Sequence, residues 1–219
     1  MNEQIESLPL LQRLALSYAP REARPLTLGL MALDQRLAGI VSRASEPMLA
    51  QIRLAWWREL LRQEPESWPK GEPLLALLQN WGGDAAKLVP LVDGWESAVT
   101  GEDDLAASDI ERLAGARGEA FGVLATVLGH QGAAKIASRM AHDWALADLA
   151  SHLSAPNDRE TARVLLAHAA WDRKRLPRAL RPVSVLNGLA ARSARTGTGL
   201  DQLSPSAIIP AMRIGLFGR

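Results

Sequence analysis

Apolar residues recur along most of this chain at the three- and four-residue spacing of amphipathic helices. Alanine and leucine dominate these stretches, and alternating strand patterns are absent. Proline and glycine clusters mark where helices end. The predicted helices span Glu3–Tyr18, Leu26–Arg43, Glu46–Gln63, Pro73–Trp81, Asp84–Ser97, Ser108–Leu128, Gly132–Leu153, Arg159–Trp171 and Val183–Ser193, with a less regular segment near Ser206–Leu216. We therefore expect an all-α fold and, because no linker or repeat interrupts it, a single domain over residues 1–219.

The predicted helix at Glu46–Gln63 carries two adjacent tryptophans and charges that do not sort onto one face. Ser45 is a favourable N-cap. An apolar stripe follows at helical spacing, formed by Leu49, Ile52, Trp56 and Leu60, and the polar arc holds Gln51, Arg58 and Arg62. Arg53 and Glu59 fall inside the apolar arc, where an unpaired charge is costly. We expect a mostly buried helix, whose charges face either another helix in an ion pair or a ligand in a helical cavity.

The two longest predicted helices carry small residues and a polar pair. Glycines at 115, 118 and 122 recur at helical spacing, which indicates the close approach of another helix or a ligand. Asp148 and His152 stand one turn apart on a face otherwise rich in alanine. This pair is either an acid/base couple or an interior hydrogen bond.

Composition narrows the classes of function. The net charge of +1 argues against a nucleic-acid binder, because phosphate contacts need a basic surplus. The absence of cysteine excludes disulfides and thiolate chemistry, and the four histidines lack zinc or di-iron spacing.

Targeting signals are also missing from the sequence. The first residues lack an apolar signal core, and no apolar run reaches the length of about 18 residues that spans a bilayer. We expect a cytoplasmic protein with no transmembrane segment. Peripheral membrane contact stays open, because the run Ile208–Phe217 is apolar with a basic residue inside it.

Several blocks together resemble the squalene/phytoene synthase superfamily, the all-α isoprenoid synthases that join two prenyl diphosphates. The blocks are Tyr18-Ala19-Pro20, Arg24-Pro25-Leu26, Trp56-Trp57-Arg58-Glu59, Arg117-Gly118-Glu119-Ala120-Phe121-Gly122, Trp144-Ala145-Leu146-Ala147 and Leu176-Pro177-Arg178-Ala179-Leu180. The resemblance implies an isoprenoid-synthase-like helical bundle around a central cavity.

The chain departs from these enzymes at their two aspartate-rich motifs, which hold Mg²⁺ for the substrate diphosphates. Ionising an allylic diphosphate needs metal ions to neutralise the leaving group. At the first motif the sequence has Ala38, Gly39 and Ser42, with Asp34 one turn earlier. At the second motif, Asp148 is the only carboxylate. Asp34 and Asp148 are therefore the nearest remnants of the metal motifs, on helices expected to face each other.

This pattern resembles the superfamily branch without synthase motifs, which includes mitochondrial assembly factors of respiratory complex I. The resemblance implies a pseudoenzyme, or an altered enzyme, without a cofactor. It would keep an apolar cavity for an isoprenoid or other lipid, or bind a protein partner. Arg53, Trp57 and Glu59 are expected to line the cavity, and Asp148 with His152 is the residual acid/base pair. The alternative is an active prenyl transferase of terpenoid chemistry with an atypical diphosphate site, in which Arg53 and Arg36 hold phosphate in place of metal. Mg²⁺ is expected as a cofactor only in this alternative.

Overall fold

The computed structural model describes residues 2–44, 46–100, 104–197, 200 and 212–215, and within them every regular element is helical. This confirms the predicted all-α class. The elements are α1 (Asn2–Glu6), α2 (Leu10–Ser17), α3 (Arg24–Arg43), α4 (Pro47–Arg62), η1 (Pro65–Ser67), α5 (Pro73–Leu78), η2 (Gln79–Leu88), α6 (Val89–Glu96), α7 (Ala107–Val127), α8 (Gln131–His152), α9 (Pro156–Leu166), η3 (Arg178–Leu180) and α10 (Arg181–Thr196).

Four predicted helices, Glu3–Tyr18, Pro73–Trp81, Asp84–Ser97 and Arg159–Trp171, begin or end elsewhere. The first splits at Pro9, which has no N–H for a helical hydrogen bond and stands before α2. The region after α5 is the 3₁₀ segment η2, which is kinked at Gly82, where φ is 53° and the backbone is not helical. The helix predicted to reach Trp171 ends at Leu166, and Trp171 itself has a φ of 47°. Ser45 and most of Ser206–Leu216 lie outside the described residues.

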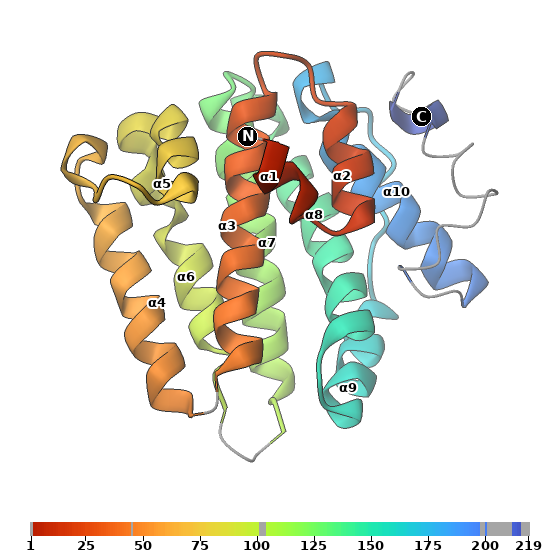
Figure 1. Cartoon of the computed structure of the whole chain (residues 1–219). Helices are drawn as coiled ribbons and strands as arrows, with labels where there is room; N and C mark the ends of the chain where they lie inside the picture. Colours follow the sequence, from red (N-terminus) through yellow and green to blue (C-terminus); the bar gives the residue numbers. More distant parts are fainter. Residues whose placement is uncertain (1, 45, 101–103, 198–199, 201–211, 216–219) are drawn as a thin grey trace.

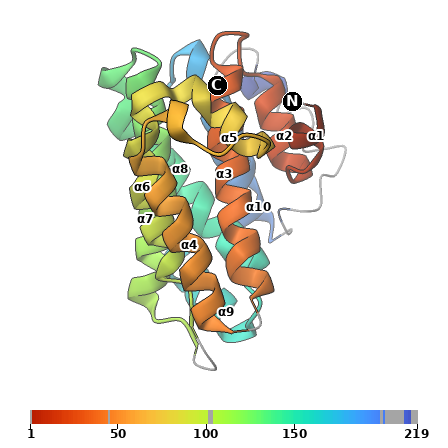
Figure 2. The same cartoon turned by 60° about the vertical axis from the view of Figure 1, so that its left-hand side comes forward.

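The long helices α3, α4, α6, α7 and α8 run side by side along one axis, as the two views show (Figures 1 and 2). Helices α7 and α8 form the closest pair. A Cβ atom at Gly118 would lie 2.7 Å from the carbonyl oxygen of Ser138, and one at Gly122 would lie 3.3 Å from that of Ala134. The recurring glycines of α7 therefore serve close helix packing.

Helix α4 lies at the edge of the bundle, and the structure corrects which of its faces is buried. The residues that face the core are Ala50, Leu54, Trp57, Leu60 and Leu61. Of the predicted stripe only Leu60 is buried, and Ile52 is 60% exposed. Arg58, expected on the polar arc, pairs with Asp93 at 2.7 Å and also with Glu96. The prediction of a mostly buried helix is wrong because the apolar arc is wide enough for α6 and α3 to cover only one side of it.

Candidate functional site

A pocket of about 790 Å³ opens at the end of the bundle where α3 ends and α4 and α9 begin, the lower end in Figure 1. One wall comes from the last turns of α3 and the first turn of α4, through Ala38, Gly39 and Ala50. The opposite wall comes from the end of α8, through Leu149 and His152. The pocket therefore lies between segments that are far apart in the sequence but adjacent in the fold.

The positions that line the pocket include those where the sequence lacks the expected aspartates. Ala38, Gly39 and Ser42 line it from α3, and Ser154 lines it from the turn after α8. All four side chains are small or absent. These small residues leave space in the pocket and contribute no charge to its walls.

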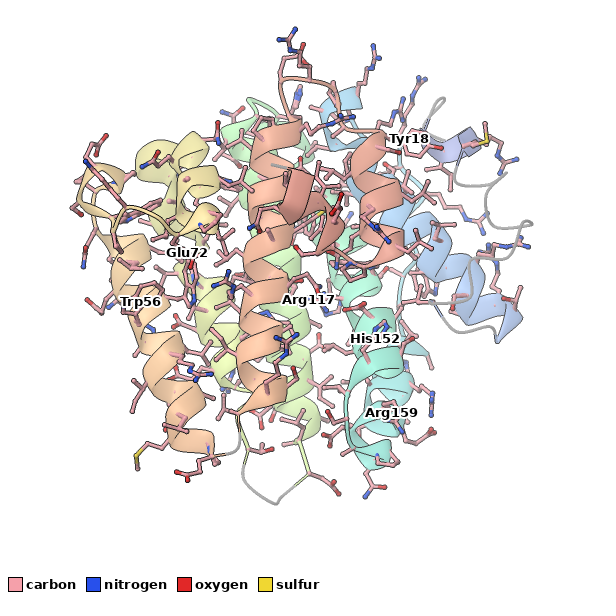
Figure 3. All side chains as sticks on the ribbon, in the orientation of Figure 1. Tyr18, Trp56, Glu72, Arg117, His152 and Arg159 are labelled. Atoms are coloured by element: carbon pink, nitrogen blue, oxygen red, sulfur yellow. The ribbon has the colours of Figure 1, made fainter. Side chains whose placement is uncertain are left out.

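A row of four polar side chains runs along the inner end of the pocket, from Asp34 through Arg117 and Asp148 to His152. The Arg117 guanidinium donates to Asp34 Oδ2 through Nη2 at 2.9 Å and Nε at 3.1 Å. Its Nη2 also lies 2.8 Å from Asp148 Oδ2. His152 Nδ1 lies 3.2 Å from Asp148 Oδ1, so the row leads from the core to the pocket wall (Figure 3). Of the four, Arg117, Asp148 and His152 line the pocket.

Two tryptophans complete the surroundings of Arg117, which is only 1% exposed. The guanidinium carbon lies 4.6 Å from the ring centroid of Trp144 and 5.6 Å from that of Trp95. Trp95 Nε1 donates to Asp34 Oδ1 at 2.8 Å. Aromatic faces attract a desolvated cation, so the tryptophans stabilise the guanidinium together with the two carboxylates.

The two carboxylates of the row have opposite pKa shifts. Burial raises the pKa of Asp34, and this effect outweighs the charge of Arg117 and the hydrogen bonds from Arg117 and Trp95. Burial also opposes ionisation of Asp148, but the charge of Arg117 and the contact with His152 prevail and lower its pKa to about 2. Burial disfavours the charged Arg117, yet the two carboxylates outweigh it and raise its pKa. Asp148 and Arg117 are therefore charged at neutral pH.

A second, smaller void of about 50 Å³ adjoins Asp148 and His152 and is lined by Gln12 and Trp144. Both amide atoms of Gln12 and Nε1 of Trp144 are buried and have no hydrogen-bond partner among the described residues. Buried polar groups in folded proteins are nearly always paired, and this void can hold a water molecule. The polar end of the site thus offers the Trp144 Nε1 donor and the Gln12 amide in addition to the charged row.

The structure places the two residues predicted to bind metal, Asp34 and Asp148, against the Arg117 guanidinium. Asp34 and Asp148 contact the same Arg117 nitrogen from α3 and α8. Within the described part of the chain, no three His, Cys, Asp or Glu residues form a group that could hold a metal ion. The expected metal-binding role of Asp34 and Asp148 is therefore not supported by this geometry, because both carboxylates are already paired with the Arg117 guanidinium.

The other predicted site residues lie outside the pocket lining. Arg53 and Glu59 are exposed, so their predicted burial is wrong, and Glu59 pairs with Arg62 at 3.0 Å. Arg36 pairs with Glu72 at 3.1 Å and lies over the Trp57 ring. Trp57 is buried in the core. None of the four is placed to contact a ligand in the pocket.

Arg117 is the site residue that the sequence reasoning missed. In the sequence it is one residue of a block that resembles the synthases, but it also stands among Leu113, Ala114 and Phe121 on the apolar face of its helix. Asp34 stands in the same way between Leu33 and Leu37. A charged residue inside an apolar helix face is the same signal that singles out Arg53. Applied to α3 and α7, this signal identifies Asp34 and Arg117 as candidates for a buried pair.

Three comparisons with known proteins give no relative. No protein-family model matches the chain, and neither curated proteins nor solved structures match it significantly. Within the described residues, no helix combines the length and apolar character needed to cross a membrane. Function has to be inferred from the pocket and the charges around it.

Proposed function

We propose that this chain is a squalene/phytoene synthase-like pseudoenzyme that binds a neutral isoprenoid or similar lipid in the pocket. The observation that carries the proposal is the Arg117 guanidinium, held between the carboxylates of Asp34 and Asp148 at the inner end of the pocket. A buried cation that is already paired twice has little charge left for a diphosphate. The ligand therefore enters with its chain against the apolar walls and a weakly polar end toward Asp148 and His152.

The charge of the pocket supports a neutral ligand. Its lining carries the carboxylates of Asp104, Asp148 and Asp158 against the guanidinium groups of Arg43 and Arg117, which leaves one negative charge when His152 is neutral. A diphosphate would need Mg²⁺ or free arginines to offset this repulsion. A hydroxyl or carbonyl end group needs only hydrogen-bond partners, which Asp148, His152 and the adjacent Gln12 amide can supply.

The size of the pocket also fits a lipid chain. A volume of about 790 Å³ lies in the range of roughly 300–1,000 Å³ that is typical of small-molecule sites. Its walls include Val41, Val99, Leu105 and Leu149. Removing such a chain from water is favourable by about 0.8 kcal/mol for each buried methylene.

The outer face of α4 provides a route for the lipid. The first turn of α4 contributes Pro47 to the pocket, while Met48 on the same turn is 67% exposed. The exposed apolar residues continue away from the mouth as Leu49, Ile52 and Trp56 (Figure 3 labels Trp56). An exposed stripe of this kind beside a pocket mouth is suited to contact a lipid surface, so we propose that α4 docks on the membrane from which the ligand is taken.

The resemblance adds independent support. The pocket lies between the two stretches in which the resembling enzymes place their metal motifs, at Ala38–Ser42 and at the end of α8. A loss of aspartates on both sides of one pocket fits a protein that keeps the cavity of the enzymes without their diphosphate chemistry.

A thermal-shift titration with farnesol and farnesyl diphosphate, each with and without Mg²⁺, tests the proposal. We expect farnesol to raise the melting temperature, since a ligand at 100 times its Kd stabilises the native state by about 2.7 kcal/mol. The diphosphate should have a weaker effect that Mg²⁺ does not change. Stabilisation by the diphosphate only in the presence of Mg²⁺ would contradict the proposal and favour the prenyl transferase.

Gly39→Leu provides a variant that blocks the pocket without disturbing the fold. Gly39 lines the pocket, and a Cβ atom there meets nothing within 4 Å. The matched control is Gly115→Leu on α7, which meets no neighbour within 4 Å either and lies outside this pocket. We expect Gly39→Leu to keep its helical circular dichroism and lose the farnesol shift, and Gly115→Leu to keep both.

A further inference from the structure

The chain segment that leads into α10, together with the first residue of that helix, carries a dense group of cations. The cations are Arg173, Lys174, Arg175, Arg178 and Arg181. Helix α10 begins with Arg181, beside the turn that joins α2 to α3, at the top of both views (Figures 1 and 2).

Arg181 is buried without a counterion that the structure shows. The residue is 5% exposed, and its Nε and Nη1 atoms have no hydrogen-bond partner. No ion pair to Arg181 is present among the described residues, in contrast to the exposed Arg163, which pairs with Glu160 at 3.0 Å. Leaving a buried guanidinium unpaired is costly, so a native protein keeps one only where something pairs with it.

Ser184 adds a second unpaired group on the same side of α10. It lies one turn after Arg181, is also 5% exposed, and its Oγ atom has no partner. Residues three apart lie on one helix face, and side chains tilt toward the N-terminus of their helix. The Ser184 hydroxyl is therefore directed toward the same helix end as Arg181.

The electrostatics at this end favour an anion. The first turn of a helix carries a partial positive charge, so a cation is unfavourable there and an anion is favourable. Burial, followed by the like charges of Arg175 and Arg178, lowers the pKa of Arg181. Nearby, the Nε atom of Arg24 at the start of α3 is also buried and unpaired, and Glu22 is the acidic residue of the adjoining turn.

We propose that the N-terminus of α10 is a phosphate-binding site, in which Arg181 and Ser184 contact the phosphate oxygens and the exposed Arg175 and Arg178 attract it. A phosphate has several acceptor oxygens, which match the donors left unpaired here. The site lies apart from the neutral-lipid pocket and does not depend on its function. The shared chemistry is a phosphate group, either of a soluble compound or of a lipid headgroup.

A thermal-shift titration with inorganic phosphate, against sodium chloride of equal ionic strength, tests this site. We expect phosphate to raise the melting temperature of the wild type above the chloride control. Arg181→Met should be more stable than the wild type without phosphate, because an unpaired buried charge is removed, and should show no phosphate shift. Ser184→Ala should weaken the response several-fold, and Arg163→Met should leave it unchanged.

Two further arms identify the source of the phosphate and the outcomes that overturn the site. Co-sedimentation with vesicles of phosphatidic acid, but not phosphatidylcholine, that is lost in Arg181→Met assigns the site to a lipid headgroup. A phosphate shift without vesicle binding assigns it to a soluble phosphate. An equal phosphate shift in Arg181→Met overturns the proposal. So does a wild type that ignores phosphate together with a destabilised Arg181→Met, since Arg181 would then have a counterion within the protein.

Discussion

Two buried arginines of this bundle, one at the inner end of the pocket and one at the start of α10, are in opposite states of pairing. Arg117 contacts two carboxylates and two tryptophan rings. Arg181 contacts no carboxylate among the described residues, and two of its three nitrogens are unpaired. Burial alone therefore does not show whether a charged side chain stabilises the fold or is available to a ligand. The number of its partners within the protein does.

The comparison separates structural charge from charge available to a ligand. At Arg117, the counter-charges come from α3 and α8, so the guanidinium joins three helices and helps to shape the pocket end. At Arg181, the neighbours are cations and a helix N-terminus, so the missing partner has to be an anion. The same residue type thus indicates a neutral ligand in the pocket and a phosphate at the start of α10.

The largest effect is expected from Arg117→Met. The change leaves Asp34 and Asp148 buried without a cation, and breaking a buried pair in this way costs about 3–5 kcal/mol. Urea unfolding followed by circular dichroism measures the loss. Arg36→Met, which breaks a partly exposed pair with Glu72, is the control and should cost at most about 1 kcal/mol. Equal losses in the two variants would mean that the carboxylate pairing of Arg117 does not stabilise the fold.

The pH dependence of the unfolding free energy measures the contribution of Asp148, one of the two carboxylate partners of Arg117. The pKa of Asp148 is about 2 in the native protein, against 3.8 for the unperturbed group. A lowered native pKa contributes stability above pH 3.8, and this contribution is lost as the pH falls from about 4 to 2. It amounts to about 2 kcal/mol, since one pKa unit corresponds to about 1.4 kcal/mol.

Urea unfolding of the wild type and Asp148→Asn at pH 5, 4, 3 and 2 checks this contribution. Asp148→Asn is less stable at pH 5, but its stability should fall less between pH 4 and pH 2, by about 2 kcal/mol. The raised pKa of Asp34 acts in the opposite direction, because its protonation favours the native state as the pH falls. Parallel curves for the two proteins would show that Asp148 is not held ionised by Arg117.

Arg181→Met should shift stability in the opposite direction to Arg117→Met. Replacing an unpaired buried charge with an apolar side chain of similar volume removes a desolvation cost, and we expect a gain of about 1 kcal/mol in phosphate-free buffer. Urea unfolding in that buffer measures it. A loss similar to that of Arg117→Met would mean that Arg181, like Arg117, is held by a counterion within the protein.

The sequence was sufficient to predict where the helices begin and end, but not which helices pack against one another. The prolines and glycines around α3, α7 and α8 placed these three within about two residues, because capping and helix-breaking are local properties. The buried face of α4 was wrong because a helical wheel shows where apolar residues lie, and only the packed neighbours decide which of them are covered.

In the candidate site, too, local sequence spacing predicts some of the contacts, and only the fold reveals the others. Asp148 and His152 could be paired from the sequence because their spacing is local. Arg117 and Asp34 are 83 residues apart, and nothing local indicates that their helices cross. The burial of Arg181 has no local signal in the sequence, since α10 packs against α2 and α8. Charges that act at long range in the sequence need the fold before they can be assigned.

The smallest expected effect is the coupling free energy between lipid binding in the pocket and phosphate binding at α10, which should be near zero. Gly39→Leu should remove the farnesol shift and keep the phosphate shift, whereas Arg181→Met should do the reverse. Because the sites share no residue, the double variant should show both losses, with a coupling free energy below about 0.5 kcal/mol. Thermal-shift titrations of the four proteins with each ligand complete the cycle. A larger coupling would mean that phosphate at α10 changes the lipid pocket, and the two would then act as one regulated site.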